Sequence, residues 1–146
     1  MKIKIFALTH KKFEVPQDKM YQPLQVGREE KEDLGYLCDN TGDNISAENC
    51  YYSELTGLYW IWKNVHTYKY VGTCHYRRYL LNEQEKIFTE AEYLELLKDY
   101  DLITTKRVVL NNSYHYGFAT NHNIHALDMT GEVIKELYPE YYDTFV

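Results

Sequence analysis

A histidine, a tyrosine and two arginines follow the apolar segment 70–74 in direct succession. These residues are His75, Tyr76, Arg77 and Arg78. A short apolar run is typical of a buried strand, and in α/β proteins ligands bind beyond the carboxyl ends of the strands. A guanidinium group suits phosphate or carboxylate because its planar fork meets two oxygens at once. The segment therefore predicts an anion-binding site; the alternative is two solvated arginines between packing tyrosines.

Two further predicted strands also end in polar residues. The strand at 2–9 ends in Thr9 and continues into His10, and the strand at 101–105 continues into the basic pair 106–107. If the strands are parallel, these groups lie along one edge of the sheet, where a nucleotide or phosphosugar would bind. Neither GxGxxG nor GxxxxGK[ST] occurs, which argues against Rossmann cofactors and P-loop chemistry.

A turn-rich hexapeptide at 39–44 gathers four side chains with oxygen ligands. These are Asp39, Asn40, Asp43 and Asn44. Such oxygens could hold a cation, although the spacing differs from that of a calcium loop. Asx side chains in turns also bond their own backbone. Both interpretations stay open from the sequence.

His122, His125 and Asp128 have helical spacing and could share one metal. The alternatives are a histidine bonded to backbone in the core and a histidine that contacts a ligand. The three cysteines lack zinc spacing. We therefore expect no structural zinc and no metal ligands that can be named, with at most a weak Mg²⁺ or Mn²⁺ that enters with a phosphate-bearing ligand.

Composition excludes several classes of protein. The net charge of −6 over 146 residues argues against a nucleic-acid binder, which needs a basic face. An odd number of cysteines without CxxC spacing indicates reduced thiols and a cytoplasmic location. No apolar run is long enough to span a membrane, so we expect a soluble chain that could still touch a membrane surface. Tyrosine is abundant, at 16 residues, as it often is where sugars or partners bind.

Strand and helix signals alternate along the chain. Beyond the strands, we expect an irregular stretch at 13–44, a polar loop at 111–121 and three helices. The helices cover about 47–64, from a capping box at 89–92 to about 98, and 122–138. The first helix would pack through an apolar face of Tyr51, Leu55, Leu58, Tyr59 and Trp62. This order predicts one α/β domain over 1–146 with a mainly parallel central sheet.

Four segments in order resemble a bacterial family from capsule and lipopolysaccharide O-antigen loci. They are KIKIFALTHKKF (2–13), LGYLCDNTGDNIS (34–46), ELTGLYWIWKN (54–64) and YVGTCHYRRY (70–79). The family was long labelled a domain of unknown function. Its members are assigned as glycosyltransferases, with galactofuranosyl transfer attributed to at least one branch. The resemblance covers the whole chain, which is similar to the N-terminal part of the family domain.

The resemblance implies a GT-A-like fold and transfer of a sugar from a nucleotide donor, UDP-hexose or UDP-galactofuranose, to a lipid-linked cell-surface glycan. By motif, Thr9 and His10 would lie near the nucleotide, and the hexapeptide would shape the donor loop. The segment 75–78 would line the central site, where many GT-A enzymes carry Asp-x-Asp. Two arginines would then neutralise the leaving diphosphate. The rival interpretations are a non-catalytic nucleotide-sugar or glycan-binding fragment and an assembly protein of a polysaccharide locus.

Overall fold

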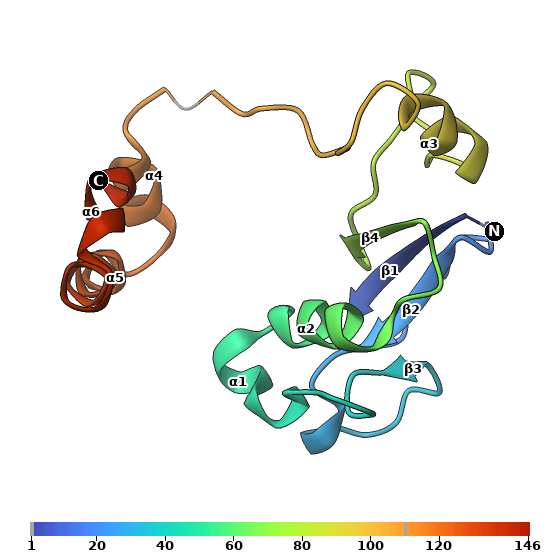
Figure 1. Cartoon of the computed structure of the whole chain (residues 1–146), viewed down its shortest axis with the longest axis horizontal. Coiled ribbons are helices and arrows are strands. Elements are labelled where there is room, and N and C mark those ends of the chain that lie inside the picture. The colour runs from blue at the N-terminus through green and yellow to red at the C-terminus, as the bar shows by residue number, and fades with distance from the viewer. Residues whose placement is uncertain (1, 110) are drawn as a thin grey trace. The chain divides into compact units, whose positions relative to one another are not determined.

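The computed structural model describes residues 2–109 and 111–146. Contacts within the chain divide it into two compact units, residues 1–105 and residues 106–146 (Figure 1). The expectation of a single domain over 1–146 stays a prediction. Each unit is described by itself.

The first unit is built on a parallel sheet of four strands in the order β3-β2-β1-β4. This confirms the predicted α/β fold with a mainly parallel sheet. Leu8 of β1 pairs with His75 of β4, and Thr9 of β1 pairs with Gln25 of β2. The carboxyl ends of neighbouring strands therefore meet at one edge. The strands are β1 (Ile3–Thr9), β2 (Tyr21–Gln25), β3 (Leu37–Cys38) and β4 (Tyr70–His75).

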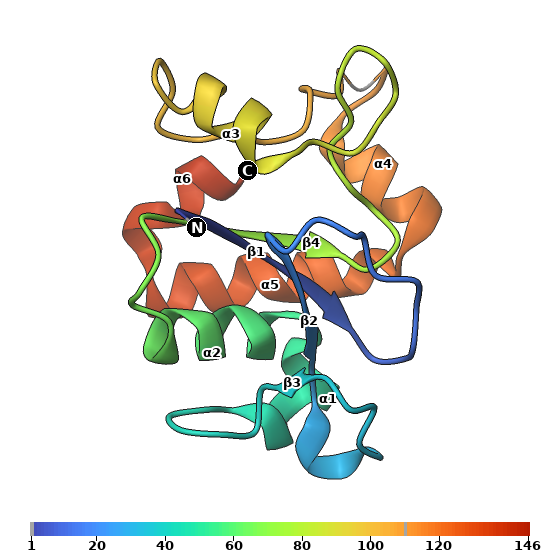
Figure 2. The same cartoon turned by 90° about the vertical axis from the view of Figure 1, so that its right-hand side faces the viewer.

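One face of the sheet packs against helix α2 (Leu55–Asn64) (Figure 2). Phe6 and Leu8 of β1 form a buried cluster with Trp60 and Ile61 of the helix. A Cβ on Gly57 would lie 2.7 Å from a methyl of Val26 and 2.9 Å from one of Leu8. Glycine at this position therefore lets the helix approach the strands closely.

The opposite face packs against helix α3 (Glu90–Leu96). Tyr93 of α3 is buried against Ile3 and Ile5 of β1, because residues along a strand alternate between its two faces. The predicted capping box is confirmed: the side chain of Thr89 accepts from the backbone of Glu92, whose side chain accepts from the backbone of Thr89.

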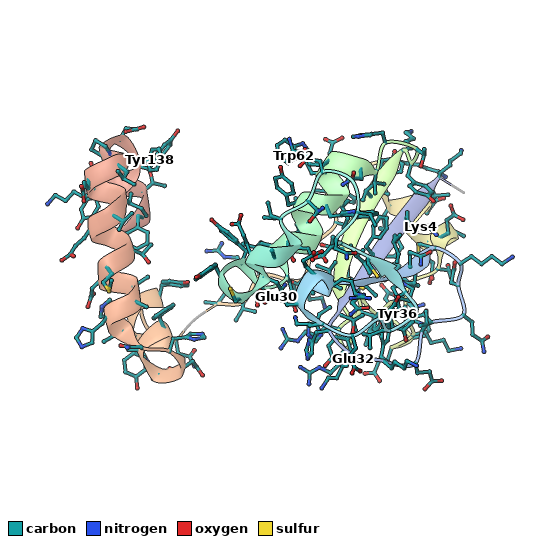
Figure 3. The ribbon with its side chains drawn as sticks, turned by 90° about the horizontal axis from the view of Figure 1, so that it is seen from below. Lys4, Glu30, Glu32, Tyr36, Trp62 and Tyr138 are labelled. Atoms are coloured by element: carbon teal, nitrogen blue, oxygen red, sulfur yellow. The ribbon has the colours of Figure 1, made fainter. Side chains whose placement is uncertain are left out.

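The helix expected at 47–64 is broken, and its predicted packing face is wrong. Ser53, with φ 51°, separates α1 (Asn49–Tyr52) from α2, and the 3-10 helix η2 (Ser46–Glu48) precedes α1. Leu55 is largely exposed, and Trp62, labelled in Figure 3, is 67% exposed. The side that packs on the sheet contains Thr56, Gly57, Trp60 and Ile61. Those residues share the same helical spacing, and the small ones decide which side fits closely against the strands.

The stretch expected to be irregular at 13–44 contains strands β2 and β3 and the 3-10 helix η1 (Arg28–Glu30). Proline seldom occurs in an inner strand because it cannot donate to the ladder, yet Pro23 lies inside β2. The backbone N–H of Val26 donates to Thr9 of β1. Successive residues of a strand direct their N–H groups to opposite sides, and Pro23 lies three residues before Val26. The nitrogen of Pro23 therefore faces β3. The pairing with β3 begins only at Leu24, and Pro23 therefore interrupts no hydrogen bond.

The strand expected at 101–105 is not formed. This segment is extended but has no partner strand within the described residues. Only Ile103 is half-buried, against the cluster that contains Tyr93.

The second unit is helical. Its elements are α4 (Tyr114–Asn121), α5 (Ile124–Leu137), the 3-10 helix η3 (Pro139–Tyr141) and α6 (Tyr142–Phe145). The predicted loop at 111–121 is therefore mostly helix, begun by Ser113, whose hydroxyl accepts from the backbone of Tyr116 at 3.2 Å. The predicted end of the last long helix before Pro139 is confirmed. Among the described residues, no helix combines the length and the apolar character that a membrane span requires.

Candidate functional site

The ring of Tyr76 is the centre of an aromatic cluster just beyond the carboxyl end of β4. Tyr76 is 6% exposed. The ring of His10 meets it edge-on at 5.6 Å, and the rings of Phe13 and His75 lie at 5.7 and 4.3 Å. The fold therefore brings the polar ends of β1 and β4 together, as the sequence predicts.

Two cations lie against the same ring. The Lys11 ammonium is 5.8 Å and the Arg77 guanidinium 5.1 Å from its centre, within the range of a cation–π contact. The hydroxyl of Tyr76 is buried and has no hydrogen-bond partner among the described residues. A buried hydroxyl without a partner costs stability.

The electrostatic field at this edge is positive. Burial lowers the pKa of His10 below its ordinary value, and the charges of Lys11, Lys31, His75 and Arg77 lower this pKa further, in that order. His10 is therefore neutral at pH 7 and can accept or donate a hydrogen bond. A concentration of cations on a chain of net charge −6 is suited to a small anion.

His75 is held by its neighbours in one orientation. Its Nδ1 accepts from the backbone N–H of Arg77 at 3.1 Å, and its Nε2 lies 3.4 Å from a carboxylate oxygen of Glu54. The Nδ1 side of the ring therefore faces the turn after β4, and the Nε2 side faces Glu54. The backbone N–H of Arg78 donates to the carbonyl of His75 at 2.9 Å, so the chain turns sharply after β4.

The turn separates the two arginines. Arg77 lies on the Tyr76 ring, whereas Arg78 lines a cavity of about 680 Å³ beside β4. Cys74 lines the same cavity, and burial raises the pKa of its thiol to about 12. The thiol is therefore protonated and unreactive at neutral pH.

Thr9 shapes the chain that leaves β1. Its side chain is buried, and its hydroxyl donates to the carbonyl of Lys11 at 2.5 Å and accepts from the N–H of the same residue at 3.1 Å. These two bonds fix the turn that directs Lys11 toward Tyr76. The structure thus places Thr9 beneath the site and His10 at its surface.

Asp39 is fully buried, with 0% exposure. Its carboxylate accepts four hydrogen bonds: from the backbone of Gly27 at 2.8 Å and Arg28 at 3.1 Å, and from the hydroxyls of Ser46 at 2.6 Å and Thr56 at 2.7 Å. The side chain therefore joins the end of β2 to η2 and α2.

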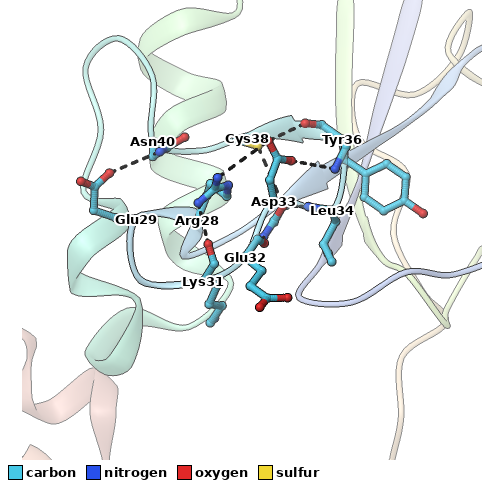
Figure 4. A network of polar contacts seen from close by, with 11 residues as sticks. Arg28, Glu29, Lys31, Glu32, Asp33, Leu34, Tyr36, Cys38 and Asn40 are labelled. Atoms are coloured by element: carbon cyan, nitrogen blue, oxygen red, sulfur yellow. Dashed lines mark hydrogen bonds and ion pairs between the residues drawn. The ribbon is translucent and has the colours of Figure 1, made fainter.

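The loop between β2 and β3 is held by polar contacts of its own (Figure 4). Arg28 donates to the carbonyl of Lys31 at 2.5 Å and pairs with Asp33 at 3.7 Å. Asn40 donates to Glu29 at 3.3 Å. These contacts fix the first half of the loop, up to Lys31.

Gln25 fixes the other half of this loop and was missed by sequence reasoning. It is fully buried; its amide donates to the carbonyl of Glu32 at 2.7 Å and accepts from the N–H of Leu34 at 2.9 Å. Lys31 and Glu54 were missed too, because they reach the edge from segments whose positions depend on this packing. A glutamine at the end of a strand, where its side chain is buried, indicates a role in fixing the next loop. Recognising that role for Gln25 requires that β2 be identified first.

The other residues of the hexapeptide mostly bond to the protein itself. Asn44 accepts from Ser46 at 3.1 Å and donates to Gly42 at 3.0 Å. Asp43 accepts from the hydroxyl of Tyr59 at 3.0 Å. These contacts match the Asx-turn alternative for this segment.

His122 and His125 belong to the second unit and are not on one helix. His122 follows the end of α4 in extended conformation, and His125 lies in the first turn of α5. Asp128 lies 4.0 Å from His125 and 3.8 Å from His115. Neither this group nor any other set of three or more His, Cys, Asp or Glu side chains in residues 2–109 and 111–146 is placed so that it could hold a metal ion.

Two comparisons relate this chain to known proteins, and a third finds no match. A protein-family model described as "Domain of unknown function (DUF4422)" matches residues 4–146. A solved structure of the bifunctional glycosyltransferase WbbM in its apo form matches with a TM-score of 0.78 and 28% sequence identity, over 97% of this chain and 30% of that one. This chain thus spans less than a third of the length of that protein. No curated protein matches the sequence.

Proposed function

We propose that this chain, which belongs to the DUF4422 family, binds the nucleotide-sugar donor of a glycosyltransferase. The likeness to WbbM supports a glycosyltransferase-like function. The observation that carries the proposal is the set of cations around Tyr76, at the sheet edge where α/β proteins bind their ligands. The donor would be a UDP-hexose, including UDP-galactofuranose, and the enzyme a hexosyltransferase.

The donor's diphosphate would lie against the cationic edge. Arg77 offers a planar fork that meets two phosphate oxygens, and Lys11 adds a flexible charge beside the same ring. When the sugar leaves, negative charge grows on the diphosphate, and cations already in place stabilise it without reorganisation. The neutral ring of His10, which lies at the surface, would complete the contacts as a hydrogen-bond partner.

Asp39 would act on the donor indirectly. Its four hydrogen bonds to the protein leave the carboxylate enclosed, and they fix the loop that bears Lys31. We assign it a positioning role, with Asn40, Asp43 and Asn44 shaping the adjacent turn.

A divalent cation would depend on the donor. The described residues offer no preformed cluster of metal ligands, so the fit to a resident metal is poor. Mg²⁺ or Mn²⁺ would take most of its ligands from phosphate oxygens and water.

The acceptor would be a hydroxyl of a lipid-linked glycan, with the reaction at the inner face of the cytoplasmic membrane. Incubation of the purified chain with radiolabelled UDP-hexoses and lipid-linked acceptor fractions tests transfer, with Arg77→Ala as the matched control. Labelled glycan product that depends on Arg77 supports the proposal.

A second candidate is a nucleotide-sugar-binding module without transferase activity. The cations around Tyr76 account for binding of the donor alone, and they would serve such a module equally well. Binding of UDP-hexose without product selects this candidate. Absence of both binding and product contradicts both.

A further inference from the structure

The sheet of the first unit has an open side. β4 is an edge strand of the sheet. The backbone N–H of Tyr70 donates to the carbonyl of Lys2, and that of Tyr76 donates to the carbonyl of Leu8 in β1. Because alternate residues of a strand direct their backbone groups to opposite sides, the N–H groups of Val71, Thr73 and His75 face away from β1. The outward side of His75 is already bridged to Arg78 in the turn after β4. No strand pairs with Val71 or Thr73 on this side within the described residues.

An extended segment of the same unit lies across a cavity from this edge. Residues 101–105 and β4 line the same cavity of about 680 Å³. Ile103 already packs on the apolar cluster on the α3 face of the sheet, whereas the apolar side chain of Leu102 is 78% exposed. The sequence of the segment is that of a strand, yet its backbone is unpaired.

The connection between the two has the form that parallel strands require. Residues 76–100 leave β4, pass through α3 on one face of the sheet and return as the extended segment. A strand–helix–strand crossover of this length joins neighbouring parallel strands, almost always with right-handed sense. Open sheet edges are also rarely left uncovered in native proteins.

We propose that residues 101–105 dock along the free edge of β4 as a fifth, parallel strand. Docking closes the cavity and pairs the outward amides of β4. It also brings Thr105, at the carboxyl end of the new strand, level with the edge that carries His75. This inference concerns the fold of the first unit and does not depend on the proposed function.

Amide hydrogen exchange, followed by NMR, tests the docking in the intact chain. Docking predicts that the amides of Val71 and Thr73 exchange about tenfold or more slowly than in variants that cannot pair. Proline has no backbone N–H, so Leu102→Pro and Thr105→Pro each remove one donor. The N–H groups of residues 102 and 105 point to opposite sides of the extended segment. One of the two variants therefore removes a hydrogen bond to β4. Leu102→Ala and Thr105→Ala keep the N–H and serve as matched controls.

The expected result is protection in the parent and both alanine variants, and its loss in at least one proline variant. Amides facing β1, such as that of Gly72, should stay protected throughout, which shows that the variants fold. Fast exchange of the Val71 and Thr73 amides in the parent overturns the proposal. Protection that grows with protein concentration and accompanies a dimer also overturns it, because a second copy then covers the edge.

Discussion

The guanidinium of Arg77 lies 5.1 Å from the centre of the Tyr76 ring, while its neighbour Arg78 lines the cavity beside β4. Two adjacent arginines therefore have different surroundings. Arg77 shares its ring with Lys11. For this reason we assign phosphate binding to Arg77 and not to Arg78.

Replacing Arg77 by alanine should weaken UDP binding by about 1.5–3 kcal/mol, the range for a hydrogen bond to a charged group. Arg77→Lys should restore only part of the affinity, because it keeps the charge and loses the fork. Isothermal titration with UDP measures both. Arg78→Ala is the matched control and should bind like the parent. Equal losses in the two alanine variants would show that the cluster acts only through its net charge.

Asp39→Asn should lower the free energy of unfolding by about 1–3 kcal/mol, because an amide can satisfy fewer of the four donors that the carboxylate now accepts. Urea denaturation measures the change. Asp43→Asn, in the same turn but exposed, should change it by no more than about 0.5 kcal/mol. Equal effects of the two substitutions would contradict the buried network as the source of rigidity.

Tyr76→Phe should leave the free protein at least as stable as the parent, with a gain of up to about 1 kcal/mol, since it removes a buried hydroxyl without a partner. Tyr76→Ala should cost about 3–5 kcal/mol, because the ring is a packing centre. Thermal and urea unfolding test both variants. A clear loss of stability in Tyr76→Phe would mean that the hydroxyl is bonded in the free protein.

The lowered pKa of His10 predicts a dependence of donor binding on pH. The pKa of a histidine in the unfolded chain is about 6.5. Because the pKa of His10 is lower in the folded protein, the fold has its full stability at pH values above the unfolded pKa. That stability is lost as the pH falls through the folded pKa. A bound diphosphate opposes the surrounding cations and should raise the pKa of His10. Affinity for UDP-hexose, whose diphosphate diester does not titrate near neutrality, should therefore increase as pH falls through that range.

NMR titration of the His10 ring, with and without UDP-hexose, checks this prediction. Lys11→Ala should also raise the pKa of His10 by removing the charge that lowers it most, whereas Lys4→Ala, a lysine that does not contribute to this shift, should not. A pKa of His10 that is the same with and without UDP-hexose would exclude the ring from the donor site.

The sequence predicted the strands that are apolar and regular, and with them the edge where the site forms. β1 and β4 have that character, and the polar residues at their ends meet around Tyr76 as expected. β2 was missed because Pro23 usually excludes an inner strand. Its place depends on β3 beginning only after that proline, which no local pattern reveals.

The packing face of α2 was predicted wrongly for a similar reason. Leu55 and Trp62 have helical spacing, but so do Thr56 and Gly57, and the sheet takes the smaller pair because it allows closer approach. Lys31 and Gln25 escaped notice because their roles arise from a loop that only tertiary contacts fix. Sequence periodicity reports local structure, and these residues depend on contacts between distant segments.

Binding of UDP-hexose to the purified chain, mapped by the amide shifts of an NMR titration, tests the central claim most directly. We expect saturable binding at one site, with the largest shifts at His10, Lys11, Tyr76 and Arg77 and little change in affinity for Arg78→Ala. No binding at millimolar ligand, or shifts confined to residues away from the carboxyl edge of the sheet, would contradict it.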